Sequence, residues 1–130
     1  MKETRISLTQ AEWGVMECLW EAGPLTGREV IQRMEKSCGW SRSTTLTLLS
    51  RLENKGALRS VPAEKGPKVF SPVLRREEAA LGETKDFLDR VYQGSLSLMV
   101  SALTKKQALS REELDELYEL LKGLEEDRHD

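Results

Sequence analysis

The spacing of apolar residues along this chain of 130 residues changes twice, and each change limits what the chain can fold into. Up to Lys55 apolar residues recur every three to four positions, as on one face of a helix, whereas from Ala57 to Ser71 they alternate with polar residues, as in strands. From Leu74 onward the helical spacing returns. The pattern therefore predicts short helices, then a pair of strands, then a second helical part.

Local capping signals mark where the first predicted helices begin and end. The pairs Thr9/Glu12 and Thr26/Glu29 have the S/T-x-x-E form, in which two side chains satisfy free backbone N–H groups of a first helical turn. Gly56 stands where a helix typically closes. The three predicted helices run from Thr9 to Glu21, from Thr26 to about Ser37, and, after the N-cap Ser41, from Arg42 to Lys55.

A β-hairpin is predicted after the third helix. Its strands are Ala57–Val61 and Lys68–Ser71, and the segment 62–67, which contains Pro and Gly, forms the turn. The order helix, helix, helix, hairpin is that of a winged helix-turn-helix. We therefore expect a mainly α protein whose residues 1–73 form a winged helix-turn-helix DNA-binding domain of three helices plus a β-hairpin wing.

Residues 74–130 are predicted to form an α-helical dimerisation domain with an acidic, disordered tail. Helices are expected over Arg76–Gln93 and Leu96–Leu103, and a third capping box at Ser110 opens a helix to about Glu125. The apolar stripe of this last helix has no obvious partner within so small a chain, and isolated helices of this length are marginal in water. We therefore expect a homodimer, with the interface residues Phe87, Val91, Leu98, Leu103, Leu114, Leu117, Tyr118 and Leu121.

Charge and composition narrow the function classes. Residues 1–75 hold 12 Lys/Arg against 8 Asp/Glu, and residues 76–130 hold 8 against 14, so only the front half suits a polyanion. Cys18 and Cys38 form neither a metal clamp nor a convincing disulfide framework, and the single histidine, His129, anchors no triad or zinc site. We expect no catalytic residue, no metal and no cofactor. Because no apolar run could span a membrane and no secretory leader is visible, we expect a cytoplasmic location.

The third predicted helix carries the residues that point to DNA. On a helical wheel Leu46, Leu49 and Leu52 lie on one side, and polar side chains lie on the other, among them the short Ser50 and Asn54 and the long Arg51. Such side chains let a helix enter a major groove, and the hairpin adds two lysines. The predicted DNA-binding residues are Ser41, Arg42, Ser43, Thr44, Thr47, Arg51, Lys65 and Lys68.

Other interpretations of the same residues are possible besides DNA binding. A Ser/Thr/Arg face is most often just a solvated surface, and the three tryptophans, Trp13, Trp20 and Trp40, fit core anchors better than base-stacking platforms. A winged helix also serves as a protein-interaction module, and a non-specific DNA-binding protein would use the same basic residues, although a stronger positive balance would be expected of it. An enzyme is the weakest alternative, because no Cys/His or Ser/His pair organises a site.

A set of motifs runs through nearly the whole chain: residues 8–13 (LTQAEW), Val15-Met16, Leu19-Trp20, Trp40-Ser41, Thr44-Thr45, residues 48–58 (LLSRLENKGAL), Gly94-Ser95 and Leu109-Ser110. In combination they resemble the penicillinase repressor family (BlaI/MecI/CopY). The resemblance implies a homodimeric winged-helix transcriptional repressor whose front domain binds palindromic operators and whose rear helices form the dimer. It maps the recognition helix onto Ser41 to Lys55.

The resemblance also implies a partner and a means of release, namely a membrane-bound metalloprotease sensor that leads to cleavage in the dimerisation region. The β-lactam-responsive members carry an Asn-Phe scissile bond there, and this chain departs from it, with Ala102-Leu103 at the matching position as the candidate proteolysis site. The copper-responsive members carry CxC motifs near the C-terminus, and none follows Tyr118, which argues against copper sensing. The wing strand has Ser71 where a tyrosine is common.

Overall fold

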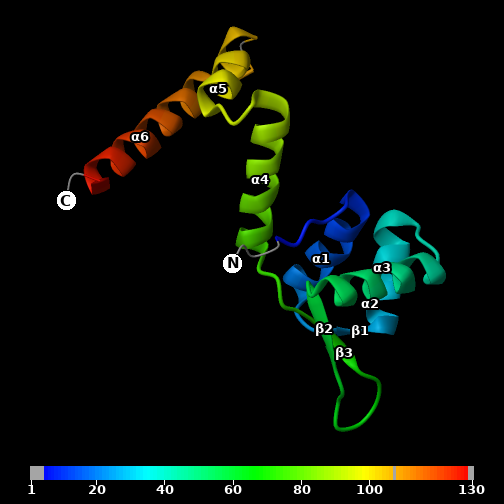
Figure 1. The fold of residues 1–130 in the computed structure, drawn as a ribbon. Helices are drawn as coiled ribbons and strands as arrows, with labels where there is room; N and C mark the ends of the chain where they lie inside the picture. The colour runs from blue at the N-terminus through cyan, green and yellow to red at the C-terminus, as the bar shows by residue number, and fades with distance from the viewer. Residues whose placement is uncertain (1–4, 107, 129–130) are drawn as a thin grey trace. The chain divides into compact units, whose positions relative to one another are not determined.

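The computed structural model describes residues 5–106 and 108–128 (Figure 1). The chain divides into two compact units, Met1–Thr84 and Lys85–Asp130, which are described separately below. The boundary between the two units lies about ten residues after residue 74, the expected start of the dimerisation domain. The first two turns of α4 (Arg76–Tyr92) belong to the first unit. The predicted fold class, a mainly α chain with a winged helix-turn-helix at its front, is confirmed.

Three helices open the first unit: α1 (Gln10–Ala22), α2 (Gly27–Cys38) and α3 (Arg42–Lys55). Both predicted capping boxes are present, since the Thr9 hydroxyl accepts from the Glu12 backbone N–H at 3.1 Å and a Glu12 carboxylate oxygen accepts from the Thr9 N–H at 2.8 Å. The second box is built in the same way on α2. Gly56 ends α3 in the left-handed conformation (φ 84°), as its position predicted.

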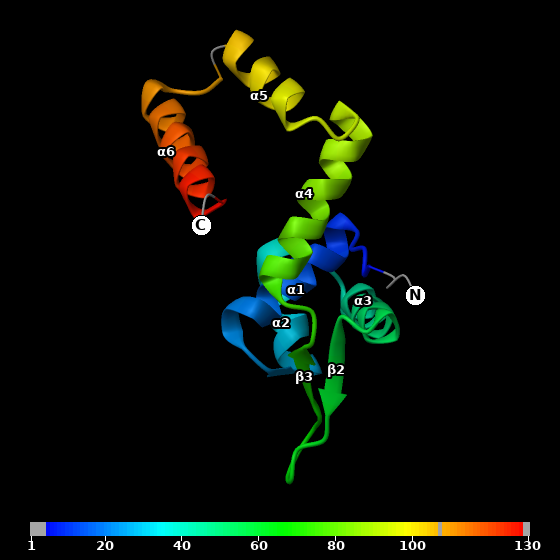
Figure 2. The ribbon, with the colours of Figure 1, turned by 60° about the vertical axis from the view of Figure 1, so that its left-hand side comes forward.

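The predicted hairpin is part of a small antiparallel sheet of three strands, one of which the sequence did not predict. Strands β2 (Leu58–Val61) and β3 (Val69–Pro72) form the predicted wing, whose connecting loop extends beyond the three helices (Figures 1 and 2). The unpredicted strand is β1 (Leu25–Thr26), which pairs with β3 and gives the order β1-β3-β2. In this register Leu25 lies opposite Phe70, so β1 attaches the beginning of α2 to the wing.

One hydrophobic core unites α1, α2, α3 and the wing. Among its fully buried side chains are Met16, Leu19, Leu49, Leu52 and Leu58. Trp13, Trp20 and Trp40 are partly buried and pack against this core, as predicted. The ring of Trp40 lies over the backbone of α1, where a Cβ at Gly14 would be 3.5 Å from it, and this contact fixes the turn that leads into α3.

The inward face of α3 differs from the prediction at one position. Leu46 was expected to point inward with Leu49 and Leu52, but its side chain is 40% exposed. Thr45 and Leu48 occupy the core instead. The buried arc of α3 is therefore rotated by about half a helical position, because the fully buried Thr45 takes an inward position that the leucine pattern alone did not indicate.

The chain after the wing is tied back onto α1. The Trp20 indole N–H donates to the Leu74 carbonyl at 2.9 Å, and the Arg76 guanidinium pairs with the Glu17 carboxylate at 2.6 Å. Ala79 in the second turn of α4 is buried in the core. These contacts hold the first turns of α4 against the winged helix-turn-helix within one unit.

The second unit consists of the end of α4, α5 (Leu96–Lys105) and α6 (Arg111–Arg128). The predicted third capping box opens α6, with Ser110 and Glu113 exchanging hydrogen bonds at 3.1 Å. This helix continues to Arg128, past the predicted end near Glu125 and into the tail that was expected to be disordered. His129 and Asp130 lie outside the described residues.

Candidate nucleic-acid interface

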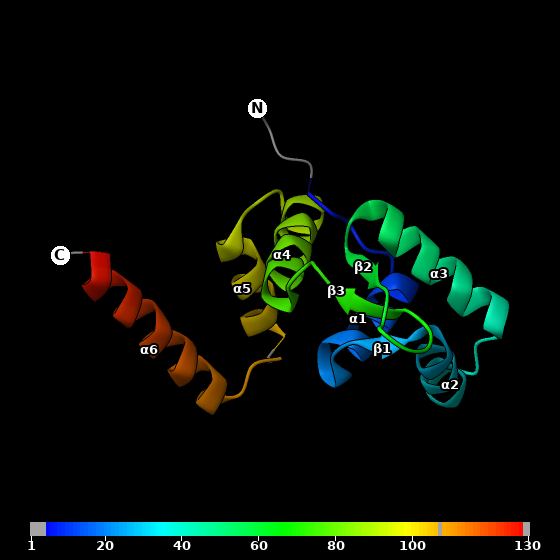
Figure 3. The same cartoon turned by 90° about the horizontal axis from the view of Figure 1, so that it is seen from below.

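The outward face of α3 gathers most of the residues predicted to bind DNA. Ser43, Thr44, Thr47 and Arg51 are all exposed along it, and Arg42 is exposed in its first turn. The helix is seen along its length at the side of the first unit in Figure 3. Two further exposed polar side chains, Ser50 and Asn54, belong to the same face. Short hydroxyl and amide groups thus cover four turns of a helix that no other described segment buries on this side.

Hydroxyl groups crowd the beginning of α3. Ser41 is its N-cap and accepts from the Thr44 backbone N–H at 3.2 Å. The Ser41 hydroxyl also lies 3.0 Å from the Thr44 hydroxyl and 3.3 Å from the Ser43 hydroxyl. Ser41 is therefore first a structural cap, and the neighbouring free N–H groups of this turn are the ones that favour an anion.

A groove of about 690 Å³ runs along one side of this helix, between the beginning of α2, α3 and the wing; we call it the α2–wing groove. Three cations border it: Arg28 from α2, Arg42 from α3 and Lys68 from the wing. One carboxylate, that of Glu53, also lines it and accepts a hydrogen bond from the Ser60 hydroxyl at 2.7 Å. Its apolar lining is formed by Ile31, Leu46, Leu49 and Phe70. The other side of α3 has a smaller hollow of about 250 Å³, bordered by Ser43, Thr44, Thr47, Leu48 and Arg51.

Arg28 is a functional candidate that the sequence analysis missed. It stands in the first turn of α2, and only β1 brings that turn beside the wing, so nothing in the local sequence placed Arg28 near Lys68. The beginning of α2 lies close to strand β3 of the wing, since a Cβ at Gly27 would be 3.4 Å from the Phe70 ring. Lys68 in turn lies 5.4 Å from the centre of that ring. Cations from three elements therefore face one groove, an arrangement suited to a phosphodiester backbone.

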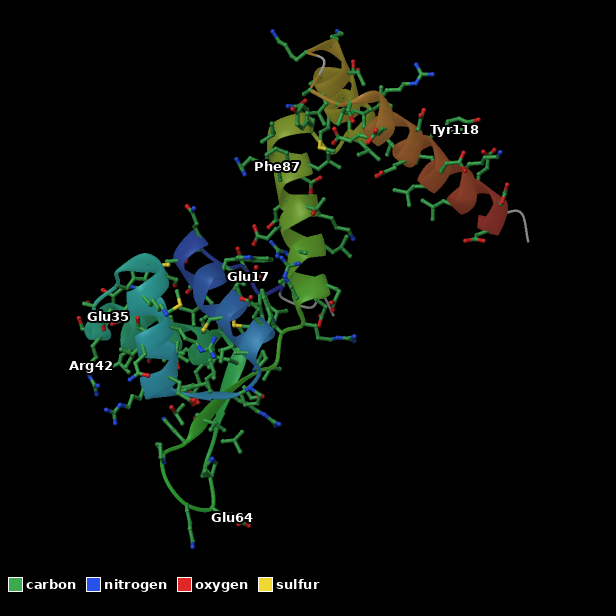
Figure 4. All side chains as sticks on the ribbon, turned by 180° about the vertical axis from the view of Figure 1, so that it is seen from behind. Glu17, Glu35, Arg42, Glu64, Phe87 and Tyr118 are labelled. Atoms are coloured by element: carbon green, nitrogen blue, oxygen red, sulfur yellow. The ribbon has the colours of Figure 1, made fainter. Side chains whose placement is uncertain are left out.

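The wing loop carries the other predicted lysine. Lys65 is exposed beside Glu64, and Figure 4 shows Glu64 at the far end of the loop. Gly66 next to them has φ 96°, a conformation that favours glycine and keeps the tip narrow. In the same figure the Arg42 side chain is directed away from the helices. Lys65 and Arg42 thus stand free for an external anion.

One cation at the end of α3 has an internal role instead. Lys55 Nζ lies 2.5 Å from the Glu12 carboxylate and 2.8 Å from the Ser7 carbonyl. Burial raises the pKa of Glu12, but the hydrogen bonds from Lys55 and Thr9 outweigh that effect and the pKa ends below its usual value. Lys55 therefore neutralises a buried carboxylate and is not counted among the DNA contacts.

The residues predicted for the dimer interface lie in the second unit, whose side chains are mostly exposed to solvent. None of the described residues from Lys85 onward is buried. Of the predicted set, Phe87, Val91, Leu98, Tyr118 and Leu121 are exposed, with Tyr118 at 65%, and Phe87 and Tyr118 are labelled in Figure 4. The remaining three, Leu103, Leu114 and Leu117, are half-buried. The predicted proteolysis site, Ala102-Leu103, is half-buried within α5.

Two cysteines, Cys18 and Cys38, lie in the described part of the chain. Cys18 is half-buried, which raises the pKa of its thiol, and Cys38 is exposed; neither is in a disulfide. Over residues 5–106 and 108–128 no three His, Cys, Asp or Glu side chains are grouped so as to hold a metal ion. No helix in those residues has the length and apolar character needed to cross a bilayer.

Comparison with known proteins gives matches over most of the chain. The family model for the penicillinase repressor matches residues 8–123. The penicillinase repressor of Bacillus licheniformis is 34% identical over 114 residues, which are 88% of this chain and 88% of that protein. The methicillin resistance regulatory protein MecI of Staphylococcus aureus strain N315 is 28% identical over 123 residues, covering 93% and 98%.

A solved structure matches the first unit. The solution structure of Bacillus licheniformis BlaI, in monomeric form and in complex with the blaP half-operator, superposes with a TM-score of 0.52. The identity is 31%, and the match covers 60% of this chain and 93% of that one. The resemblance noted in the sequence is thus confirmed, and this chain belongs to the penicillinase repressor family of winged-helix transcriptional repressors.

Proposed function

We propose that the protein is a sequence-specific transcriptional repressor that binds a palindromic operator as a homodimer. The observation that carries the proposal is the α3 surface, where an exposed row of short polar side chains is bordered by Arg28, Arg42 and Lys68. The polar row supplies donors and acceptors for base edges in the major groove, and the cations supply phosphate contacts on one side of it. Ser43, Thr44, Thr47 and Arg51 are the proposed base-reading residues.

The wing extends this contact along the duplex. Lys68 borders the α2–wing groove and Lys65 lies in the loop beyond it, so both can meet the backbone while α3 occupies the adjacent major groove. Each phosphate that these cations neutralise releases counterions, and affinity should therefore fall steeply with salt. Bound in this way, the protein occupies its operator and needs no catalytic group of its own.

A second copy is the proposed partner of the rear unit. Leu98, Tyr118 and Leu121 are more than half exposed, and the described part of Lys85–Asp130 has no buried residue. Apolar surface of this extent is favourably removed from water by a matching surface, and a two-fold axis would then pair the recognition helices with a two-fold operator. Residues 74–130 are accordingly our proposed dimerisation domain, with the contact between copies made from Lys85 onward and the first turns of α4 packed in the first unit.

Release from the operator follows from the family resemblance. A membrane-bound metalloprotease sensor is the expected upstream partner, acting on a repressor in the cytoplasm, and Ala102-Leu103 is the expected site of cleavage. The site belongs to α5, a helix of 10 residues without a buried side chain. Short helices that bury little open at low cost, which would give a protease access to an extended segment.

The proposal is tested by selecting bound duplexes from a random DNA pool with the purified full chain at near-physiological salt. We expect an inverted repeat whose half-sites are about one helical turn apart. The matched control is the Arg42→Ala, Lys68→Ala double variant, which should recover the same motif with lower yield, because the two cations contact backbone and not bases. Uniform recovery of all sequences would identify a non-specific DNA-binding protein, and no recovery at any salt would leave a protein-interaction module; either result overturns the proposal.

A further inference from the structure

Leu46 is an exposed apolar side chain between the polar face of α3 and the apolar lining of the α2–wing groove. Its exposed fraction is 40%, and among the described residues before Val73 it is the only large hydrophobic side chain that is exposed. The core already takes Leu48, Leu49 and Leu52 from the same helix. Leu46 is therefore not part of the core, and contact with an apolar group of a ligand would remove its exposed surface from water, which is favourable.

The neighbours of Leu46 place it between a proposed phosphate contact and the row of polar side chains on α3. Arg42 and Ser50 are four residues before and after it, so the three side chains follow one another along the same side of α3. All three border the α2–wing groove. Thr47, the next residue, belongs to the outward face, so Leu46 lies at the margin between the groove and the row of polar side chains.

The major groove of DNA offers such a side chain a particular partner. The edges of the four base pairs present hydrogen-bond donors and acceptors, and thymine alone adds an apolar group, its C5-methyl. Of the leucine, isoleucine and phenylalanine side chains that line the groove, Ile31, Leu49 and Phe70 are buried and only Leu46 is exposed. This is less apolar surface than the contiguous core of a protein-docking face. We propose that Leu46 is a specificity-determining residue that recognises thymine through contact with this methyl group.

This inference rests on the proposed function, because it requires α3 to enter the major groove. It adds a preference that the polar side chains do not supply: each operator half-site should contain a thymine whose methyl group contacts Leu46. A cytosine or a uracil at that position would leave the leucine against a polar edge or an empty space. The preference is therefore apolar in origin and separable from any hydrogen bond.

The test uses the duplex recovered by selection and replaces its thymines, one at a time, with deoxyuridine, which removes the methyl group and leaves every hydrogen-bonding group. For the unchanged protein we expect one position per half-site at which the replacement weakens binding about fourfold, the value for ~0.8 kcal/mol per buried carbon group. The Leu46→Ala variant should bind the thymine and deoxyuridine duplexes equally. Because each protein is compared with itself on two duplexes, a reduced folded fraction cancels from the ratio.

Leu81→Ala is the matched control, since it makes the same truncation at an exposed leucine (56% exposed) of α4 that is not among the proposed DNA contacts. This variant should keep the Leu46-dependent, fourfold difference at the same thymine. If the protein binds a selected motif and deoxyuridine has no effect, or has the same effect in Leu46→Ala, the inference fails while the repressor function stands. A selected motif without thymine would also contradict the inference about Leu46. If no duplex binds at all, both this inference and the proposed repressor function are wrong.

Discussion

The Glu12 carboxylate, which is 1% exposed, accepts a hydrogen bond from Lys55 Nζ at 2.5 Å. This pair joins the first turn of α1 to the last turn of α3, because Glu12 is also the acidic member of the capping box with Thr9. A buried carboxylate with only an N–H partner would be costly, and Lys55 supplies the compensating charge. The recognition helix is thereby fixed in the unit at the end remote from its N-cap.

Acid should weaken this connection. Since the pKa of Glu12 is lower in the folded protein than its ordinary value of 4.5, its contribution to stability is fully present above pH 4.5 and is lost as the pH falls through the folded value. Glu12→Gln should lower the free energy of unfolding at pH 7 by about 1–3 kcal/mol. It should also flatten the decline of stability below pH 4.5, as measured by urea unfolding.

The control for that measurement is Glu17→Gln, which removes the carboxylate of the exposed pair with Arg76. Exposed ion pairs contribute about 0–1 kcal/mol, so this variant should unfold almost like the unchanged protein and keep its acid response. An equal loss in the two variants, or an unchanged acid response in Glu12→Gln, would show that Lys55 and Glu12 do not act as a buried pair.

A substitution at Thr45, in contrast to the one at Glu12, should make the protein more stable. Thr45 is fully buried, and its hydroxyl is without a hydrogen-bond partner in the described structure. Thr45→Val keeps the β-branched shape and removes the unpaired group, so the free energy of unfolding should rise by about 1 kcal/mol. Thr47→Val, at an exposed position of the same helix, is the control and should change stability little. A less stable Thr45→Val protein would mean that the hydroxyl is paired.

The features that were predictable from the sequence are the local ones. The caps Thr9, Thr26, Ser41 and Ser110 act within a single helical turn, so their residue types identify the helix starts without knowledge of the fold. The hairpin was also predictable, because its alternation and its turn are contained in residues 57–71. These signals were sufficient for the order of elements and hence for the fold class.

Features that depend on tertiary contacts were missed. A strand of two residues, Leu25–Thr26, has no periodicity of its own and exists because Phe70 and Val69 pair with it. Without that strand the sequence gives no reason to place Arg28 beside the wing. The helical wheel likewise assigned Leu46 to the core, since hydrophobicity alone does not distinguish a core leucine from one that faces a ligand.

Arg28 should act as a phosphate contact. Arg28→Ala is expected to weaken binding to all duplexes by a similar factor and to reduce the slope of log affinity against log salt by about 1. Arg33→Ala is the matched control, because Arg33 is also an exposed arginine of α2 but borders a hollow lined by Cys18 and Cys38. Fluorescence anisotropy over a salt series measures both slopes. An unchanged slope for Arg28→Ala would remove this residue from the interface.

Arg51 should behave differently, because its position on the outward face suits a guanine edge. Arg51→Ala is expected to cost roughly 1–3 kcal/mol of operator binding and to relax the sequence preference at one base pair of each half-site. Selection from a random pool with the variant measures the second effect directly. Loss of affinity with an unaltered motif would reassign Arg51 to the phosphate backbone, and unchanged affinity would exclude it from the contact surface.

The dimer should depend on the apolar face of α6. Leu121 is 51% exposed there, and Leu121→Asp places a charge where the proposed second copy packs, so sedimentation equilibrium should show a shift from dimer to monomer. Operator affinity should then fall on the order of 100-fold, because the second half-site is no longer bound intramolecularly. Glu119→Arg, which changes the charge on the other side of the same helix, should leave both the dimer and the affinity intact. A Leu121→Asp protein that stays dimeric would place the interface elsewhere in the rear unit.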